Sequence, residues 1–129
     1  MISGLGTDLV EVARLRRLLE RWGGRFLEKV YLAEEIEYCH ARPDPAPHYA
    51  ARLAAKEAVF KALGEGWTGR LGWKDVLVVR CPGGAVRVEL LGKGAELARL
   101  RRVERIELSL SHDGGYALAF AVACRESKE

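Results

Sequence analysis

The segment RLAAKEAVFKALG, Arg52–Gly64, decides the fold because its composition predicts a helix that is apolar over most of its circumference. At 100° per residue, one side of this helix consists of small residues suited to close packing against another element: Ala54, Ala55, Ala58 and Ala62. The other half mixes large apolar residues with charged ones: Arg52, Lys56, Glu57 and Lys61. Buried charges must be paired or bound to something. The segment therefore predicts either a Glu57–Lys61 surface ion pair or a carboxylate and an ammonium that face a polar cleft.

The rest of the chain predicts a strand, helices and hairpins in a segregated order. The expected elements are a strand over 2–8, helices over 11–25, 31–41 and 48–63, a hairpin over 75–91, a helix over 93–103 and a hairpin over 105–124. Loops are expected at the proline-rich stretch 42–48 and the glycine-rich stretch 64–72. Hairpins in place of regular strand–helix–strand alternation predict an α+β fold with a mainly antiparallel sheet.

Length and composition indicate one globular domain, residues 1–129, with 49% hydrophobic and 30% charged residues. The start of the chain has neither a basic leader nor an apolar signal core, and no stretch approaches the length of a membrane span, so a cytoplasmic location is expected. Cys39, Cys81 and Cys124 are odd in number and far apart, which favours reduced structural thiols. A zinc site at Cys39 and His40 is not expected, because adjacent helical residues point in different directions.

A row of arginines follows the predicted helix over 11–25 at spacings of three and four: Arg14, Arg17, Arg21 and, if the helix continues through two glycines, Arg25. Such a row is usually a solvated face. It could also dock an acidic partner, because guanidinium groups bind carboxylates and phosphates bidentately. The net charge of +3 is too small to indicate nucleic-acid binding.

Asp8 and His112 are the other candidates for catalytic or ligand-binding residues. Asp8 could cap the arginine-rich helix, with Glu11 completing a capping box, or it could meet Glu57 as an oxygen ligand of magnesium. Gly4 and Gly6 are weak evidence for a nucleotide site, because no further glycine-rich turn follows them. His112 could be a structural histidine or a hydrogen-bond donor to a phosphate. A nucleophilic pair with Ser111 is not expected, because adjacent strand residues point to opposite faces.

Three motifs in this order resemble the holo-acyl-carrier-protein synthases, the small bacterial type of 4′-phosphopantetheinyl transferase: GLGTDLVEVARL at 4–15, RLAAKEAVFKALG at 52–64 and LSLSHDGGYALAFAV at 108–122. The resemblance covers nearly the whole chain. It implies the fold of that family and a homotrimer with active sites between subunits. It also implies transfer of 4′-phosphopantetheine from coenzyme A to a serine of apo acyl carrier protein, which leaves adenosine 3′,5′-bisphosphate and supports fatty acid biosynthesis.

The resemblance also implies roles for individual residues. Asp8 and Glu57 match the Mg²⁺ ligands, and Lys61 matches a catalytic lysine beside the pyrophosphate. Contacts to coenzyme A are implied for four residues: Arg52, Lys61, Gly64 and His112. Arg14 and Arg21 lie on the helix that docks the carrier protein. The general base is Glu57 or a metal-bound water that Glu57 orients, and the water is favoured because a carboxylate committed to a metal is a weak base.

Some features depart from the family pattern, and two other classes of protein remain open. Asp113 follows His112 where the family often has a small hydroxyl residue, Ala85 replaces a common proline, and the arginine-rich helix is more basic than usual. One alternative is a small RNA-binding domain that uses the arginine row and the basic segment 99–105, although Trp22, Trp67 and Trp73 are not spaced within these runs as a stacking platform. The other is a non-catalytic assembly subunit, whose partner binding would not depend on magnesium. Lys56 is left without a role beyond an ordinary salt bridge.

Overall fold

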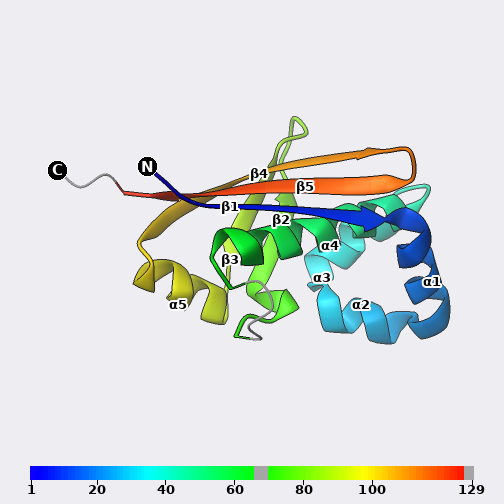
Figure 1. Ribbon diagram of the computed structural model, residues 1–129. Coiled ribbons are helices and arrows are strands. Elements are labelled where there is room, and N and C mark those ends of the chain that lie inside the picture. The colour runs from blue at the N-terminus through cyan, green and yellow to red at the C-terminus, as the bar shows by residue number, and fades with distance from the viewer. Residues whose placement is uncertain (66–69, 127–129) are drawn as a thin grey trace.

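The computed structural model describes residues 1–65 and 70–126 (Figure 1). Its strands are β1 (Ile2–Glu11), β2 (Val76–Arg80), β3 (Val86–Leu90), β4 (Val103–Asp113) and β5 (Tyr116–Arg125). Its helices are α1 (Val12–Trp22), α2 (Gly24–Val30), α3 (Ala33–His40), α4 (Pro45–Ala62) and α5 (Gly92–Leu100), with a 3₁₀ turn, η1 (Trp73–Asp75). The strands form a three-stranded antiparallel sheet, β1-β5-β4, and a separate antiparallel hairpin, β2-β3. The predicted α+β fold with antiparallel sheets is confirmed.

Helix α4 lies beneath the three-stranded sheet and forms the centre of the core (Figure 1). The sheet presents small residues to it, because every second residue of β5 faces inward: Ala117, Ala119, Ala121 and Ala123. The alanine side of α4 is buried as well. Small residues on both surfaces allow the helix and sheet to approach closely, as the sequence of α4 predicts.

Strand β1 rests on α4 at two glycines. A Cβ atom on Gly4 would lie 1.9 Å from the carbonyl oxygen of Ala62, and one on Gly6 would lie 1.9 Å from that of Ala58. Only hydrogen at these positions permits such an approach. The glycines therefore serve packing, and they bring Asp8, two residues farther along β1, next to the same helix.

We expect Gly6→Ala to destabilise the fold by about 3 kcal/mol, because the added methyl group meets a backbone carbonyl that cannot move aside within a packed helix. Chemical denaturation of the purified variant measures this change. Gly83→Ala provides a control for loss of a glycine, since its Cβ would meet no atom within 4 Å. A side chain at the left-handed φ of 90° of Gly83 still has an energetic cost. Gly6→Ala must therefore lower the free energy of unfolding more than Gly83→Ala for the packing explanation to hold.

The structure corrects several predicted boundaries. The predicted helix over 11–25 is two helices, because Gly23 adopts a left-handed φ of 50° between α1 and α2. Arg25 therefore lies on α2 and does not extend the arginine row of α1. The expected loop over 42–48 is helical from Pro45, because proline suits the first turn of a helix, where no N–H is needed. Within the predicted glycine-rich loop, residues 66–69 lie outside the described part of the chain.

Candidate active site

A cavity of about 380 Å³ opens between β1, α1, α2 and α4, with η1 on one side. Asp8 of β1 and Glu57 of α4 line it together. Basic side chains, Arg14 and Lys29, lie along its wall, and the remaining wall is mainly apolar: Leu9, Val10, Leu18, Phe26, Val30, Leu53 and Trp73. The predicted convergence of Asp8 and Glu57, from distant parts of the chain, is thus present in the fold.

The two carboxylates interact electrostatically. Burial raises the pKa of Glu57, and the negative charge of Asp8 raises this pKa further. Lys61 and Arg14 act in the opposite direction, because positive charge stabilises the carboxylate. Asp8 lies within β1, and Glu11 takes the N-cap position of α1 without a side-chain capping bond, so the alternative capping role for Asp8 is wrong.

Lys61 crosses from α4 to β1. Its Nζ donates to the carbonyl oxygen of Thr7 at 2.8 Å and lies 3.4 Å from Oδ1 of Asp8. Of the two alternatives for this segment, the Glu57–Lys61 surface ion pair is not the one formed, and Lys61 pairs with Asp8 because the packing of β1 on α4 places a second carboxylate within reach. A carboxylate pair with one ammonium beside it therefore faces the cavity.

The residues present fit a hard divalent cation that also binds substrate oxygens. Two neighbouring carboxylates repel each other, and a cation between them would relieve that repulsion. Mg²⁺ commonly takes one or two carboxylates and completes its shell with waters and phosphate oxygens. Within residues 1–65 and 70–126, no group of three or more His, Cys, Asp or Glu side chains is arranged to hold a metal. Asp8 and Glu57 thus fit a shared substrate–metal site better than a closed structural site.

We expect Glu57→Gln to raise the melting temperature in metal-free buffer at pH 7 by about 2 °C. The pKa of Glu57 is raised on folding, so the folded state holds a proton that the unfolded state releases, and stability is lost as pH rises from below the usual carboxyl pKa. The neutral amide of glutamine removes that loss, so the difference in melting temperature between the variant and the wild type should shrink below pH 4. Melting curves across this range measure it, and a Glu57→Gln variant with lower stability at pH 7 would contradict the expected strain.

Arg52 is buried in a cluster of cationic side chains on another face of α4. Its guanidinium stacks on the ring of Tyr38 at 4.2 Å, and Arg42 and Arg80 approach the same ring at 4.4 Å and 6.0 Å. Arg52 is only 1% exposed, yet its Nε and Nη2, like Nε of Arg42, have no hydrogen-bond partner within the described structure. Buried donors without acceptors are costly, so this cluster is suited to an anion.

His112 reaches this cluster through His48. The two imidazole rings lie 6.2 Å apart, edge to face, and the pKa of His48 is lowered by burial and by the nearby positive charges. Sequence reasoning found Arg52 and His112 but missed His48, Tyr38, Arg42 and Arg80. The spacing of His48 and Arg52, four residues apart on one helix, could have revealed His48, whereas the approach of Arg80 from β2 depends on the tertiary fold.

The predicted contacts to coenzyme A therefore fall into two groups. Lys61 lies beside the carboxylate pair of Asp8 and Glu57, and Gly64, with a left-handed φ of 78°, follows the end of the same helix. Arg52 and His112 belong to the cationic cluster. Arg52 and Glu57 are about 140° apart around α4, so their side chains leave the helix in different directions. The other predicted partner residue, Arg21, stacks on its neighbour Trp22 near the end of α1.

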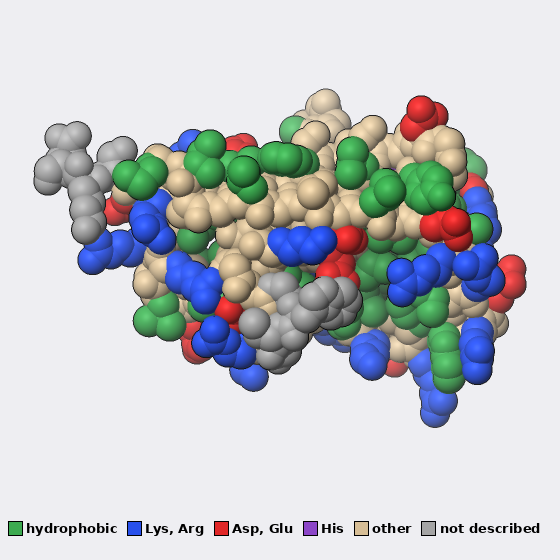
Figure 2. Space-filling model, in the orientation of Figure 1, with side chains coloured by type: hydrophobic (Ala, Val, Ile, Leu, Met, Phe, Trp, Pro, Cys, Tyr) green, Lys and Arg blue, Asp and Glu red, His purple; other side chains and the backbone are tan. Residues whose placement is uncertain are grey.

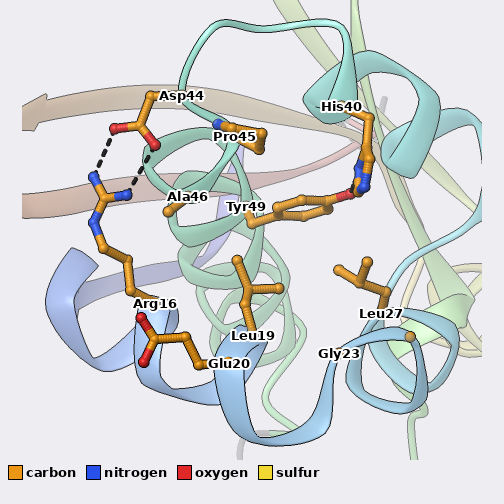
Figure 3. A pocket seen from close by; sticks show the side chains of 11 residues that line it. Arg16, Leu19, Glu20, Gly23, Leu27, His40, Asp44, Pro45, Ala46 and Tyr49 are labelled. Carbon is orange, nitrogen blue, oxygen red and sulfur yellow. Dashed lines mark hydrogen bonds and ion pairs between the residues drawn. The ribbon is translucent and has the colours of Figure 1, made fainter.

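A second cavity, of about 440 Å³, lies on the other side of α1 (Figure 3). At one end, Arg16 and Asp44 form a two-bonded ion pair, with N···O distances of 2.9 and 2.6 Å. At the other end, Nδ1 of His40 lies 2.6 Å from the hydroxyl of Tyr49. These two pairs satisfy one another, and Glu20 adds a further carboxylate to the lining of the cavity.

A family model matches residues 4–121, and its description is the 4′-phosphopantetheinyl transferase superfamily. The chain belongs to this superfamily. It is 48% identical to the holo-[acyl-carrier-protein] synthase of Desulforudis audaxviator over 128 residues, which are 99% of this chain and 97% of that protein. The protein is therefore an enzyme of the holo-[acyl-carrier-protein] synthase type.

Solved structures of the same enzyme type share this architecture. The holo-[acyl-carrier-protein] synthase of Neisseria meningitidis superposes with a TM-score of 0.89 at 30% identity, covering 97% of this chain and all of that one. The enzyme of Helicobacter pylori, solved in complex with coenzyme A, gives a TM-score of 0.83 at 29% identity, covering 93% of this chain and 99% of that one. The resemblance found in the sequence motifs is thereby confirmed.

Proposed function

We propose that the protein transfers 4′-phosphopantetheine from coenzyme A to a serine hydroxyl of apo acyl carrier protein. The reaction would depend on Mg²⁺ and leave holo carrier and adenosine 3′,5′-bisphosphate. Such a reaction would take place in the cytoplasm and supply holo carrier for fatty acid biosynthesis. The observation that carries the proposal is the convergence of Asp8 and Glu57 on one cavity, with Lys61 paired to Asp8 beside them.

The residues of this cavity suit attack on a pyrophosphate. When bound by Asp8 and Glu57, Mg²⁺ would neutralise the pyrophosphate and stabilise the leaving phosphate. Lys61 would add a positive point charge on the same side, held in place by the carbonyl oxygen of Thr7. The proton of the carrier serine would leave toward Glu57, either to its carboxylate or to a water that the carboxylate holds. The raised pKa of Glu57 brings it closer to the range that a proton acceptor needs.

The cationic cluster supplies a second anchor for coenzyme A. Nε and Nη2 of Arg52 and Nε of Arg42 lack acceptors within the described structure, and a phosphate monoester offers several charged oxygens. We therefore assign a phosphate of coenzyme A to Arg52, with His112 as a further donor. Anchoring a part of the substrate that does not react lets its binding energy position the reacting pyrophosphate.

A homotrimer explains how one substrate reaches both anchors. The outer face of the sheet carries exposed apolar side chains on adjacent strands: Leu5 and Leu9 on β1, and Tyr116, Leu118 and Phe120 on β5. Figure 2 shows hydrophobic side chains in a row along the sheet side of the molecule. An apolar sheet face of this kind favours subunit contact. Closed threefold packing would place the cationic cluster of one protomer beside the carboxylate cavity of its neighbour.

The acidic carrier protein would dock beside the cavity. Arg14 and Lys29 line the wall with Leu18 and Phe26, so cationic and apolar contacts are offered together. Arg21, farther along α1, extends the positive surface. In the described part of the chain, no helix has the length and apolar character needed to cross a bilayer.

The test combines the protein with coenzyme A, Mg²⁺ and apo acyl carrier protein and measures the carrier mass. We expect the mass of one phosphopantetheine group to be added, and we expect a chelator to prevent the addition until excess Mg²⁺ is restored. Parallel detection of adenosine 3′,5′-bisphosphate identifies the other product. If the folded protein modifies none of several apo carriers, the proposed function is wrong. RNA binding that persists without Asp8 and Glu57 would favour the alternative binding module.

A further inference from the structure

Lys56, the neighbour of Glu57 on α4, is fully buried and has no part in the chemistry proposed above. Its Nζ lies 2.9 Å from Oε1 of Glu35 on α3, and neither side chain is exposed to solvent. Burying an ion pair is costly unless additional hydrogen bonds satisfy both groups. The pair therefore requires an explanation beyond an ordinary surface salt bridge.

The remaining hydrogen bonds of Lys56 go to the two ends of η1. Its Nζ donates to the carbonyl oxygens of Trp73, at 3.0 Å, and Val76, at 2.5 Å. With Glu35, these acceptors occupy the three N–H groups that a lysine carries. The short turn that contains Trp73 is thus fixed to α4 at its first residue and just after its last.

Glu35 anchors the other side of the pair. Its Oε1 accepts the N–H of Leu32 at 2.8 Å, and its Oε2 accepts the N–H of Val78 at 2.9 Å. One buried pair therefore joins α3, α4, η1 and β2 through backbone groups. Such a fully bonded network fixes the relative positions of the elements that it joins.

The turn η1, which Lys56 fixes to α4, forms part of the cavity that Asp8 and Glu57 line. Trp73 lines the cavity together with Asp8 and Glu57, and its ring packs on Phe60 of α4 at a centroid distance of 5.4 Å. Lys56 and Glu57 are adjacent in the chain, so one residue directs a side chain into the core under η1 while the next directs its carboxylate into the cavity. The same turn of α4 sets the positions of the cavity's acid and of its aromatic wall.

We propose that Lys56, paired with Glu35, is a positioning residue that holds Trp73 as a fixed wall of the cavity beside Asp8 and Glu57. This inference rests on the proposed transfer reaction, because Trp73 would then border the reacting groups. Lys56 acts through Trp73 and does not touch substrate. A loosened wall would misplace the bound reactants, and small misplacements lower the rate of the chemical step.

The test measures Lys56→Met, which keeps the length of the side chain and removes its donors. We expect kcat for holo-carrier formation to fall about tenfold, while KM for coenzyme A stays within about twofold. Tyr49→Phe is the matched control, because it removes partly buried hydrogen bonds between α3 and α4 near the second cavity (Figure 3) and leaves Trp73 untouched. Its kcat should stay within about twofold of wild type at a temperature where each variant is folded.

A second measurement reports on Trp73 directly. With Trp22 and Trp67 replaced by phenylalanine, Trp73 is the remaining tryptophan of the three in the chain. Lys56→Met in this background should increase quenching of its fluorescence by acrylamide, whereas Tyr49→Phe should not. In the native background, Lys56→Met combined with Trp73→Leu should lose no more kcat than Trp73→Leu alone, because both changes affect one wall.

If Lys56→Met proves unstable, the Lys56→Met/Glu35→Gln variant keeps the test available, because it leaves no unpaired charge in the core. We expect this variant to fold with kcat still reduced. Wild-type kcat in either folded variant, or unchanged quenching of Trp73, would overturn the positioning role. Failure of the wild-type protein to modify a carrier would instead refute the proposed reaction, so the two failures are distinguishable.

Discussion

Asp8→Ala is expected to lower the rate of holo-carrier formation by about 10³-fold at saturating coenzyme A and Mg²⁺. The substitution removes one of the two carboxylates that face the cavity and also the partner of Lys61. Mass spectrometry of the carrier over time measures the rate. The effect should fall on the chemical step. Mg²⁺, which would stabilise the negative charge developing on the leaving phosphate, is held less firmly by one carboxylate than by two.

Metal-dependent stability separates loss of a ligand from loss of the fold. Millimolar Mg²⁺ with coenzyme A should raise the melting temperature of the wild type more than that of Asp8→Ala, because a ligand stabilises only the state that binds it. Asp44→Ala is the control for removal of a carboxylate, since Asp44 is paired with Arg16 on the surface away from the cavity. Undiminished activity of Asp8→Ala would refute the assignment of Asp8 to the metal.

Phe120→Glu is expected to convert the protein to monomers and to lower its activity by about 10²-fold or more. Phe120 is 46% exposed on β5, where it lies opposite Thr7 of β1 on the outer face of the sheet. A charge at this position would have to be buried in the proposed subunit contact. Light scattering after size exclusion measures the mass, and the carrier assay measures the activity. Glu96→Lys, at an exposed position of α5 and outside the sheet, serves as a control for a change of surface charge.

Mixing two inactive variants tests whether each site is shared between protomers. Asp8→Ala and Arg52→Met disable different groups of residues. In trimers formed from equal amounts of both, about a quarter of the sites between subunits would combine an intact Asp8 with an intact Arg52. Co-refolded mixtures should therefore recover about a quarter of the wild-type activity, while each variant refolded alone stays inactive. No recovery from verified mixed trimers would mean that one protomer supplies the whole site.

The predicted fold was confirmed where short-range patterns were sufficient. The alternating strands on either side of the Pro82–Gly84 and Gly114–Gly115 turns form the expected hairpins, because side-chain alternation and turn residues are local properties. Prediction was wrong where one residue changed the path of the backbone. Gly23 divides a helix that the apolar stripe of α1 alone would continue, since periodicity is insensitive to a single left-handed residue.

The candidate site was predicted in part. Asp8, Glu57 and Lys61 do meet, but the ion pair of Lys61 is with Asp8 and not with Glu57. A helical wheel includes only partners on the same helix, so the one partner that it could name for Lys61 was Glu57, four positions away. The cationic cluster around Arg52 was predicted incompletely for the same reason. Tyr38, Arg42 and Arg80, which were not predicted, come from other segments of the chain.

The sequence by itself determined that Arg52–Gly64 forms a largely buried helix and that its charged residues need partners, because composition and the 3.6-residue period are properties of the segment alone. Only the tertiary structure decided which partners they have. Lys56 turns into the core to Glu35, Arg52 stacks on Tyr38, and Lys61 reaches Asp8. The physical reason is that ion pairing and stacking act over a few ångströms, and residues distant in sequence come within that range only when α4 packs between the sheet and α3.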